Sequence, residues 1–346
     1  MTDLPETGNA AAIRGVLDVL LAAKRVVVTG HVKPDADALG AALALAGYLR
    51  NAGRDAIVMG IEPLPEGVKF LMEEQTPILS SRRYHRKPGD LLCLVDASSE
   101  DRMQMPLRPL FQKVPMVIVD HHWPKGDYPA QATVYAVPDA SSTCELVWNL
   151  AQAAGWPLTH PIAEALWTGI ITDTNRFAYS SSRPSTLRCA AELLEKGAVR
   201  TALIADESYN LVSERRLRLQ DRLIRSIRLL CGGRLSIGFL LPEDYAAEGA
   251  TLADSSNFVD VPRFIRGVEV AAFVYPVRNG EATCVSLRSA SDSHNVAELC
   301  ARWGGGGHIQ AAGATLPHPI AVALPEVTAV LEKFLMEDSP PDRTDS

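Results

Sequence analysis

Carboxylate and imidazole side chains follow four apolar segments in the first half of the chain, VVVTG, LLCLV, VIV and LWTGIIT. Taken singly, each has an ordinary explanation, because Asp often occupies turns and an isolated His is usually a packed, hydrogen-bonded side chain. Four such segments in succession instead indicate one shared ligand site at a sheet edge. In chain order the residues are His31, Asp35, Asp37, Asp96, Asp120, His121, His122 and Asp173.

These residue types suit a pair of hard divalent cations. Carboxylate and imidazole ligands without thiolates favour ions such as Mn²⁺ or Mg²⁺. Asp35 and Asp37 are two residues apart, so on an extended loop they can contact two different ions. With Asp96 and Asp173 they carry four negative charges, which two divalent cations would neutralise. Two ions roughly 3.5–4 Å apart activate a water molecule and stabilise the leaving oxygen of a phosphoryl displacement.

The elements that must position these residues alternate between strands and helices. Nearly continuous apolar runs predict strands near 24–30, 55–61, 89–96 and 114–120, as expected for a sheet covered on both faces. Helical spacing or helix-start signals predict helices over 10–23, 38–53, 140–155 and 161–177. Alternation of this kind is typical of a parallel α/β sheet.

The pattern changes after residue 233. The runs at 268–277 and 282–290 predict strands, and Asn279-Gly280 between them predicts a hairpin turn. Helical patterns follow at 293–304 and 322–339, and GGGGH is expected to form a loop.

The predicted architecture is α/β, with two domains for 346 residues. We expect a parallel-sheet α/β domain over 1–195, a helical connector over 196–232, a smaller α+β domain over 233–338 and a polar tail over 339–346.

Composition restricts the partners and the compartment. The formal net charge is −7, so a face that binds long duplex nucleic acid is not expected. The six cysteines are widely spaced, which favours reduced thiols in a cytoplasmic protein. We expect no secretory signal, because the N-terminus lacks a basic segment, and no membrane-spanning run.

The motifs together resemble those of the DHH phosphoesterases. The matching segments are HVKPDADALG over 31–40, Asp96, the Asp-His-His triplet at 120–122 and GIITDT over 169–174. In the second half, SLRS over 286–289 and RWGGGGH over 302–308 resemble the DHH-associated C-terminal domain. The resemblance extends from about residue 25 to 335.

The resemblance implies specific roles for the first-domain residues. His31 and Asp35 would bind one ion, Asp37, His121 and Asp173 would bind the other, and Asp96 would bridge them. The expected catalytic residues are Asp96, Asp120 and His122. Asp120 would orient His121, and His122 would face the substrate phosphate. The expected cofactors are two Mn²⁺ ions, with Mg²⁺ or Co²⁺ as alternatives.

The resemblance also assigns substrate binding to the second domain, which the family uses as a lid. Consecutive glycines can present backbone N–H groups to an anion, and a guanidinium suits phosphate. The expected binding residues are Arg288, Gly305, Gly306, Gly307 and His308. Arg288 and His308 would then face the metal residues across a cleft.

Several substrates compete within the family. The basic SRKKQ-like signature of its pyrophosphatases is absent, the chain is too short for the additional domain of its single-strand exonucleases, and the membrane segments of its cyclic-dinucleotide hydrolases are missing. The remaining branch hydrolyses short RNA (nanoRNA), linear dinucleotides such as pApA, or pAp. The alternative is a catalytically weak nucleotide-binding regulator. We expect no membrane partner, and homodimer formation is left open.

Overall fold

The computed structural model describes residues 7–32, 34–60, 64, 67–72, 78–80, 84–97, 102–103, 108–111, 114–122 and 128–337. The chain forms two compact units, Met1–Leu211 and Val212–Ser346. The polar tail expected over 339–346 lies outside the described residues.

The first unit contains a five-stranded parallel sheet in the order β2-β1-β3-β4-β5. The strands are β1 (Arg25–Thr29), β2 (Asp55–Val58), β3 (Asp90–Val95), β4 (Met116–Asp120) and β5 (Ala132–Ala136). The first four confirm the predicted strands. The edge strand β5 was not predicted, because it is short and only one of its five residues is buried.

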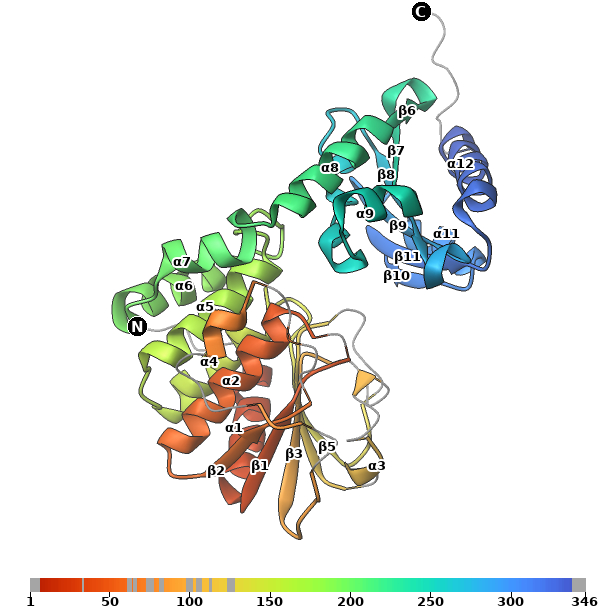
Figure 1. Ribbon diagram of the computed structural model, residues 1–346. Coiled ribbons are helices and arrows are strands. Elements are labelled where there is room, and N and C mark those ends of the chain that lie inside the picture. Colours follow the sequence, from red (N-terminus) through yellow and green to blue (C-terminus); the bar gives the residue numbers. More distant parts are fainter. Residues whose placement is uncertain are drawn as a thin grey trace, which may run out of the picture. The chain divides into compact units, whose positions relative to one another are not determined.

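Helices cover the two faces of this sheet unequally (Figure 1). One face packs under a large apolar cluster to which four helices contribute, together with buried residues between 189 and 204 later in the chain, and the other packs against a smaller cluster that includes α3. The four helices are α1 (Thr7–Ala22), α2 (Ala36–Asn51), α4 (Thr143–Ala154) and α5 (His160–Asp173), and α3 is Arg108–Phe111.

Helix α2 is buried over most of its length, and its small residues permit close contact with α5. A Cβ atom at Gly40 would collide with the backbone oxygen of Ala165. A Cβ atom at Gly47 would lie 2.9 Å from Ile162 Cγ1. The run of Ala and Gly therefore brings the start of α2, which carries Asp37, close to the end of α5, which carries Asp173.

The helical segment expected as a connector is divided between the units. Helices α6 (Pro184–Gly197) and α7 (Thr201–Ala205) and a π turn at Asp206–Asn210 belong to the first unit. Helix α8 (Glu214–Ser226) belongs to the second, where Leu219 and Leu223 lie in its apolar core. Those buried leucines make α8 a packed part of that unit.

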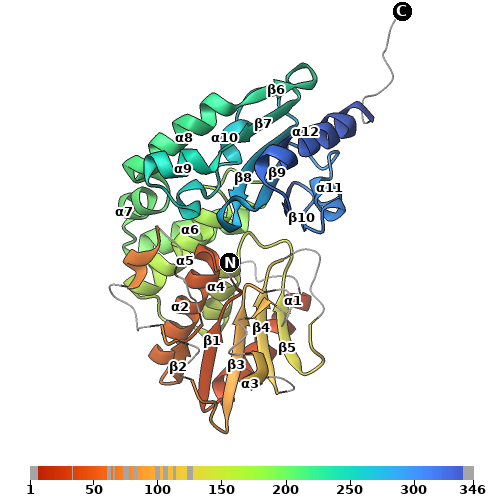
Figure 2. The same cartoon turned by 45° about the vertical axis from the view of Figure 1, so that its right-hand side comes forward.

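The second unit contains a mixed six-stranded sheet in the order β10-β11-β9-β8-β7-β6, in which only β7 and β8 pair in parallel. Figure 2 shows α8 and α9 on one face and α11 and α12 on the other. The strands are β6 (Arg228–Leu230), β7 (Leu235–Phe239), β8 (Val270–Val277), β9 (Ala282–Ser289), β10 (Gly306–His308) and β11 (Ala311–Leu316). The helices are α9 (Pro242–Glu248), α10 (Asp260–Arg263), α11 (Val296–Arg302) and α12 (Ile320–Glu337).

These observations confirm the predicted fold class and the β8–β9 hairpin, whose turn at Arg278–Gly280 has positive φ angles. The GGGGH run differs from the expected loop, because Gly306–His308 forms strand β10 and pairs with β11. All six cysteines are unpaired. Among the described helices, none combines the length and apolar character needed to span a membrane.

Candidate metal centre

The six predicted ligand residues lie together in the first unit. Each sits where a strand or helix of that unit ends or begins, so one sheet edge gathers groups that are up to 142 residues apart in the chain. Three groups of side chains in the described part of the chain could each hold a cation. Two of them share no residue, namely His31, Asp35 and Asp96, and Asp37, His121 and Asp173, and the third, Asp96, His121 and His122, takes members from both and adds His122.

The first group surrounds the imidazole of His31. Its Nε2 atom lies 3.7 Å from Asp35 Oδ2 and 3.4 Å from Asp96 Oδ2. The Nδ1 atom lies 2.7 Å from the Val32 carbonyl oxygen, so Nδ1 donates its proton there and Nε2 is the ring nitrogen left to face the carboxylates. Nε2 is buried without a hydrogen-bond partner. A metal-binding imidazole presents such an unpartnered Nε2 atom to its ion while its Nδ1 bonds a carbonyl, so the group fits a cation.

The second group surrounds His121. Its Nε2 atom lies 3.8 Å from Asp37 Oδ2 and 3.4 Å from Asp173 Oδ2. Its Nδ1 atom faces the carbonyl oxygen of Ala140 at 3.3 Å, which again leaves Nε2 for the ligand position. The donor set of two carboxylates and one imidazole matches that of the first group, and it suits the same class of hard divalent ion.

Asp96 connects the two groups. Its Oδ2 faces His31, and its Oδ1 lies 3.5 Å from His121 Nε2. The residue has φ of 55°, a left-handed conformation that is uncommon outside glycine, and its N–H donates to the Val119 carbonyl. Such a conformation persists where the surroundings enforce it, often at functional sites. The buried carboxylate thus presents one oxygen to each group.

The N-terminus of α4 fixes Asp37. The backbone N–H groups of Thr143 and Cys144 donate to its two carboxylate oxygens at 2.7 and 3.0 Å. The Thr143 hydroxyl also donates to Asp96 Oδ1 at 3.1 Å. The sequence indicated this helix start, but no local signal showed that its free N–H groups bind a carboxylate more than 100 residues away.

Gly169 allows this arrangement because a side chain there would enter it. A Cβ atom would lie 2.8 Å from Asp37 Oδ1 and would collide with Cys144 Sγ. Asp173 follows four residues later on the same face of α5. The glycine therefore brings α5 close enough for Asp173 to join Asp37.

The charges of the cluster oppose one another. Burial and the Asp96 carboxylate raise the pKa of Asp37 to about 6, and burial and Asp37 raise that of Asp173 well above its ordinary range. Burial lowers the pKa of His31 and His121, but their carboxylate neighbours outweigh it and raise both to about 10. Burial disfavours the Asp96 carboxylate, yet both histidines lower its pKa. Divalent cations relieve such repulsion, so the electrostatics fit two metals.

The structure corrects one expected role. Asp120 was predicted to orient His121, but its Oδ1 lies 2.7 Å from His122 Nδ1. Its Oδ2 accepts the hydroxyl of Tyr128 at 2.8 Å. The reason is geometric, because His121 turns its Nδ1 toward Ala140 instead. Two further residues that the sequence did not single out, Tyr128 and Arg102, therefore contact this part of the site.

The second unit contains the residues expected to bind substrate. Arg288 lies on β9, where its Nη1 donates to the Leu287 carbonyl at 3.0 Å and its Nε lies 3.8 Å from Asp260 Oδ1. Gly307 has φ of 148°, and a Cβ atom at that position would collide with the backbone of Ala311. The glycines thus permit close pairing of β10 with β11, and this is a structural reason for glycine here in addition to any anion binding.

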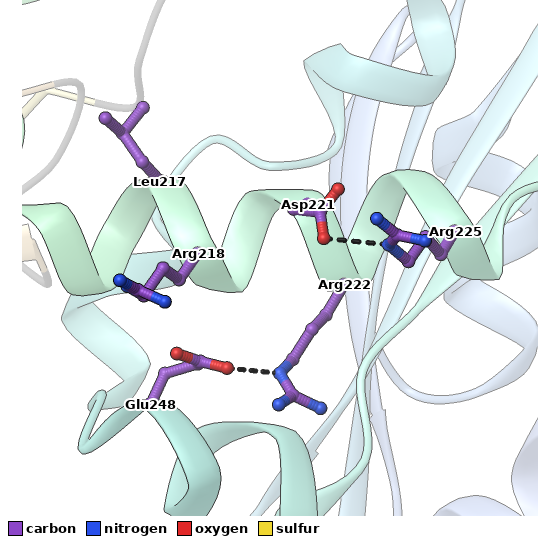
Figure 3. A pocket seen from close by; sticks show the side chains of 6 residues that line it. All are labelled: Leu217, Arg218, Asp221, Arg222, Arg225 and Glu248. Carbon is purple, nitrogen blue, oxygen red and sulfur yellow. Dashed lines mark hydrogen bonds and ion pairs between the residues drawn. The ribbon is translucent and has the colours of Figure 1, made fainter.

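A hollow of about 510 Å³ in the second unit lies beside α8 and contains none of the predicted residues. Figure 3 shows Arg222 directed at Glu248 and Arg225 directed at Asp221, with contacts of 2.6 and 2.8 Å. Arg218 pairs with Glu214 at 2.7 Å. These arginines are already paired with carboxylates, so the hollow offers little net charge to an anionic ligand.

Comparison with family models gives two matches. Residues 25–170 match the DHH family, N-terminal domain, and residues 241–337 match the DHHA1 domain. The first match contains five of the six clustered ligand residues, and the second contains Arg288 and the glycine run.

Individual relatives match most of the chain. The chain is 31% identical over 321 residues to the bifunctional oligoribonuclease and PAP phosphatase NrnA of Thermus thermophilus, and the aligned region covers 90% of each protein. It is 26% identical over 297 residues to the NrnA of Bacillus subtilis, covering 84% of this chain and 89% of that one. The crystal structure of an exopolyphosphatase-related protein from Bacteroides fragilis superimposes with a TM-score of 0.86 and 26% identity, over 95% of this chain and 97% of that one.

Proposed function

Because this chain belongs to the DHH family of metal-dependent phosphoesterases, we propose that it hydrolyses short oligoribonucleotides, linear dinucleotides such as pApA, and pAp. The observation that carries this proposal is the 31% identity, over 90% of both chains, to a bifunctional oligoribonuclease and PAP phosphatase. The complete pair of ligand groups in the first unit supports hydrolysis over the alternative of a catalytically weak binding protein.

Each ligand group is assigned one cation. His31 and Asp35 hold the first, Asp37, His121 and Asp173 hold the second, and Asp96 contributes one oxygen to each. Mn²⁺ is the proposed ion, with Mg²⁺ or Co²⁺ as substitutes, because the donors are oxygens and imidazole nitrogens. When bound, the ions supply a nucleophilic water and stabilise the leaving oxygen.

The protein's own groups position this chemistry. Asp96 fixes the spacing of the two groups because both of its oxygens are committed to facing histidines. The α4 N–H groups favour the ionised form of Asp37 and so oppose the burial that raises its pKa, since a helix N-terminus favours negative charge. Asp120 holds the Nδ1 proton of His122 and so fixes which ring nitrogen can act on a ligand.

The second unit is assigned to substrate binding through Arg288, Gly305, Gly306, Gly307 and His308. Arg288 carries a guanidinium whose contact with Asp260 is long, at 3.8 Å, so a phosphate can compete for it. Small nucleotides with terminal phosphates are the ligands that such a group recognises. Long duplexes are not proposed, since the chain has a net charge of −7.

One experiment tests the assignment. The purified chain with Mn²⁺ is offered pAp, pApA, a ladder of short 5′-phosphorylated RNA and inorganic pyrophosphate, and the products are resolved by chromatography. Asp96→Ala is the matched control, because it removes the shared ligand. We expect release of phosphate from pAp and of mononucleotides from the RNA. Exclusive hydrolysis of pyrophosphate, or binding of all four without turnover, contradicts the proposal.

A further inference from the structure

Arg102 lies beside the cluster, although it belongs to none of the sequence motifs. Its carbonyl oxygen accepts a hydrogen bond of 2.6 Å from the N–H of Val32. The next residue, Met103, forms an antiparallel bridge with His31. His31 is a member of the first ligand group, so this backbone pairing holds the segment that carries Arg102 beside that group.

A directed chain of hydrogen bonds orients the Arg102 side chain. Its Nη1 lies 3.2 Å from His122 Nε2. A guanidinium can only donate, so Nε2 is the acceptor and the ring proton is on Nδ1. That proton is donated to Asp120 Oδ1 at 2.7 Å, while Tyr128 donates to Oδ2 at 2.8 Å. Every donor in the chain is thus directed toward Asp120.

The charges of this chain are also matched. The Asp120 side chain is fully buried, and its negative charge is linked to the Arg102 guanidinium through a neutral imidazole. The pair therefore adds little net charge beside two divalent cations. A guanidinium has five N–H donors in a planar fork, and one contact with His122 leaves a face suited to two phosphate oxygens.

We propose that Arg102 binds a non-bridging oxygen of the scissile phosphate, and that His122, Asp120 and Tyr128 are positioning residues that set the direction of its guanidinium. This inference rests on the phosphoesterase activity in the proposed function and not on the identity of the nucleotide. It changes the role of His122, which was expected to face the substrate phosphate and instead orients Arg102 through its Nε2 atom. Since His122 Nδ1 lies only 3.5 Å from Asp96 Oδ1, the chain adjoins the bridging carboxylate.

The test uses the Mn²⁺-loaded full chain and a small chromogenic phosphodiester, which presents little more than the scissile phosphate. Arg102→Ala is expected to lower kcat/KM roughly 10- to 150-fold, as for the loss of a charge-assisted hydrogen bond. Tyr128→Phe removes one hydroxyl and should lower it about 2- to 13-fold. Arg188→Ala, an exposed arginine on α6, is the matched control and should not change it.

Three further measurements separate positioning from a general structural role. Inorganic phosphate should inhibit Arg102→Ala more weakly than wild type, by a factor similar to the loss in kcat/KM. Added guanidinium ion should restore part of the activity of Arg102→Ala and none in Tyr128→Phe. The Mn²⁺ affinity of both variants, measured by titration calorimetry, should equal that of wild type, because neither residue is a proposed ligand.

Unchanged kcat/KM in Arg102→Ala, or a tenfold loss of Mn²⁺ affinity with unchanged phosphate inhibition, overturns the role of Arg102. Failure of the proposed function gives a different result. A wild-type protein that cleaves the chromogenic ester but neither pAp nor short RNA overturns the substrate assignment, while the comparison of Arg102 variants on the ester still stands.

Discussion

Replacement of Gly169 by alanine adds one methyl group at the contact between α5 and the metal residues. The new Cβ atom would collide with Cys144 Sγ and would lie 2.8 Å from Asp37 Oδ1 and 3.1 Å from Asp37 Cα. The sulfur is buried and Asp37 is held by the α4 backbone, so neither can move without cost. Helix α5 must therefore shift outward.

Two opposing effects set the size of the change in stability. Alanine within a helix is favoured over glycine by about 0.5–1 kcal/mol. Overpacking of a buried contact costs about 1–3 kcal/mol and therefore outweighs the gain in helix propensity. Gly15→Ala in α1 is the matched control, because its Cβ atom would meet only Thr133 Cγ2 at an ordinary 3.8 Å. We expect Gly169→Ala to lower the free energy of unfolding and Gly15→Ala to raise it.

Metal binding should report the same displacement. Asp37 and Asp173 both belong to the second ligand group, and the added methyl group moves the helix that carries Asp173 away from Asp37. Changes to groups that support metal ligands typically lower affinity 10- to 100-fold. Calorimetric titration with Mn²⁺ should show this loss at one of the two sites in Gly169→Ala and at neither in Gly15→Ala.

A double variant separates the two causes. Adding Cys144→Ala to Gly169→Ala removes the sulfur that the methyl group meets first, so part of the stability should return in urea unfolding. The weakened Mn²⁺ site should remain, because the contact with Asp37 Oδ1 is still present. If Gly169→Ala unfolds and binds Mn²⁺ like Gly15→Ala, then the close approach of α5 to Asp37 is not what holds the second ligand group together.

Three further outcomes are expected. Asp96→Ala should leave less than about a hundredth of the wild-type kcat at saturating Mn²⁺, and a rate above about a tenth would contradict its shared position. In EDTA-treated protein, Asp37 has a pKa of about 6 against 3.8, and His31 and His121 have pKa values of about 10 against 6.5. At these groups the folded state therefore binds protons more tightly than the unfolded chain. The stability gained from the two histidines is complete below pH 6.5 and is lost as the pH rises toward 10. Differential scanning calorimetry from pH 6.5 to 9 should show a falling Tm, and a rising Tm would refute this direction. Arg288→Ala should lower kcat/KM roughly 10- to 150-fold on short RNA but little on a chromogenic diester, and equal losses on both would exclude a role in binding the remainder of the substrate.

Local patterns in the sequence were sufficient to predict that six acidic and imidazole residues share one site and to predict four of the five strands of the first sheet, and the resemblance to the DHH phosphoesterases added the roles of those residues as ligands. His31, Asp96 and His121 each follow a strand, so their position at one sheet edge could be predicted from strand direction, whereas Asp173 lies at the end of helix α5. The partners of those ligands could not be predicted in this way. The bond from Thr143 to Asp37 depends on how α4 packs beside α2, and the sequence contains no periodic signal for that contact.

The misassigned role of Asp120 has a similar cause. Adjacent residues in DHH suggested that Asp120 would support the first histidine, yet its carboxylate bonds the second. After β4 ends, side-chain direction is set by the loop conformation, which composition does not reveal. Strand β10 was missed because glycines are unfavourable in strands, and here close approach to Ala311 on β11 overrides that preference.

The supporting bonds show that the ligand atoms are oriented by the fold of the first unit. The ring Nδ1 atoms of His31 and His121 face carbonyl oxygens, and α4 fixes the carboxylate of Asp37. At the two histidines these contacts use the ring nitrogen that a cation does not need, so Nε2 is already directed toward the carboxylates, whereas at Asp37 the α4 N–H groups bond both oxygens and so fix the direction of the whole carboxylate. We therefore expect metal affinity to depend on residues such as Gly169, which offers no ligand atom, as well as on the ligand residues. A substitution that leaves all six ligands intact but moves α4 or α5 should for this reason resemble the loss of a ligand in a Mn²⁺ titration.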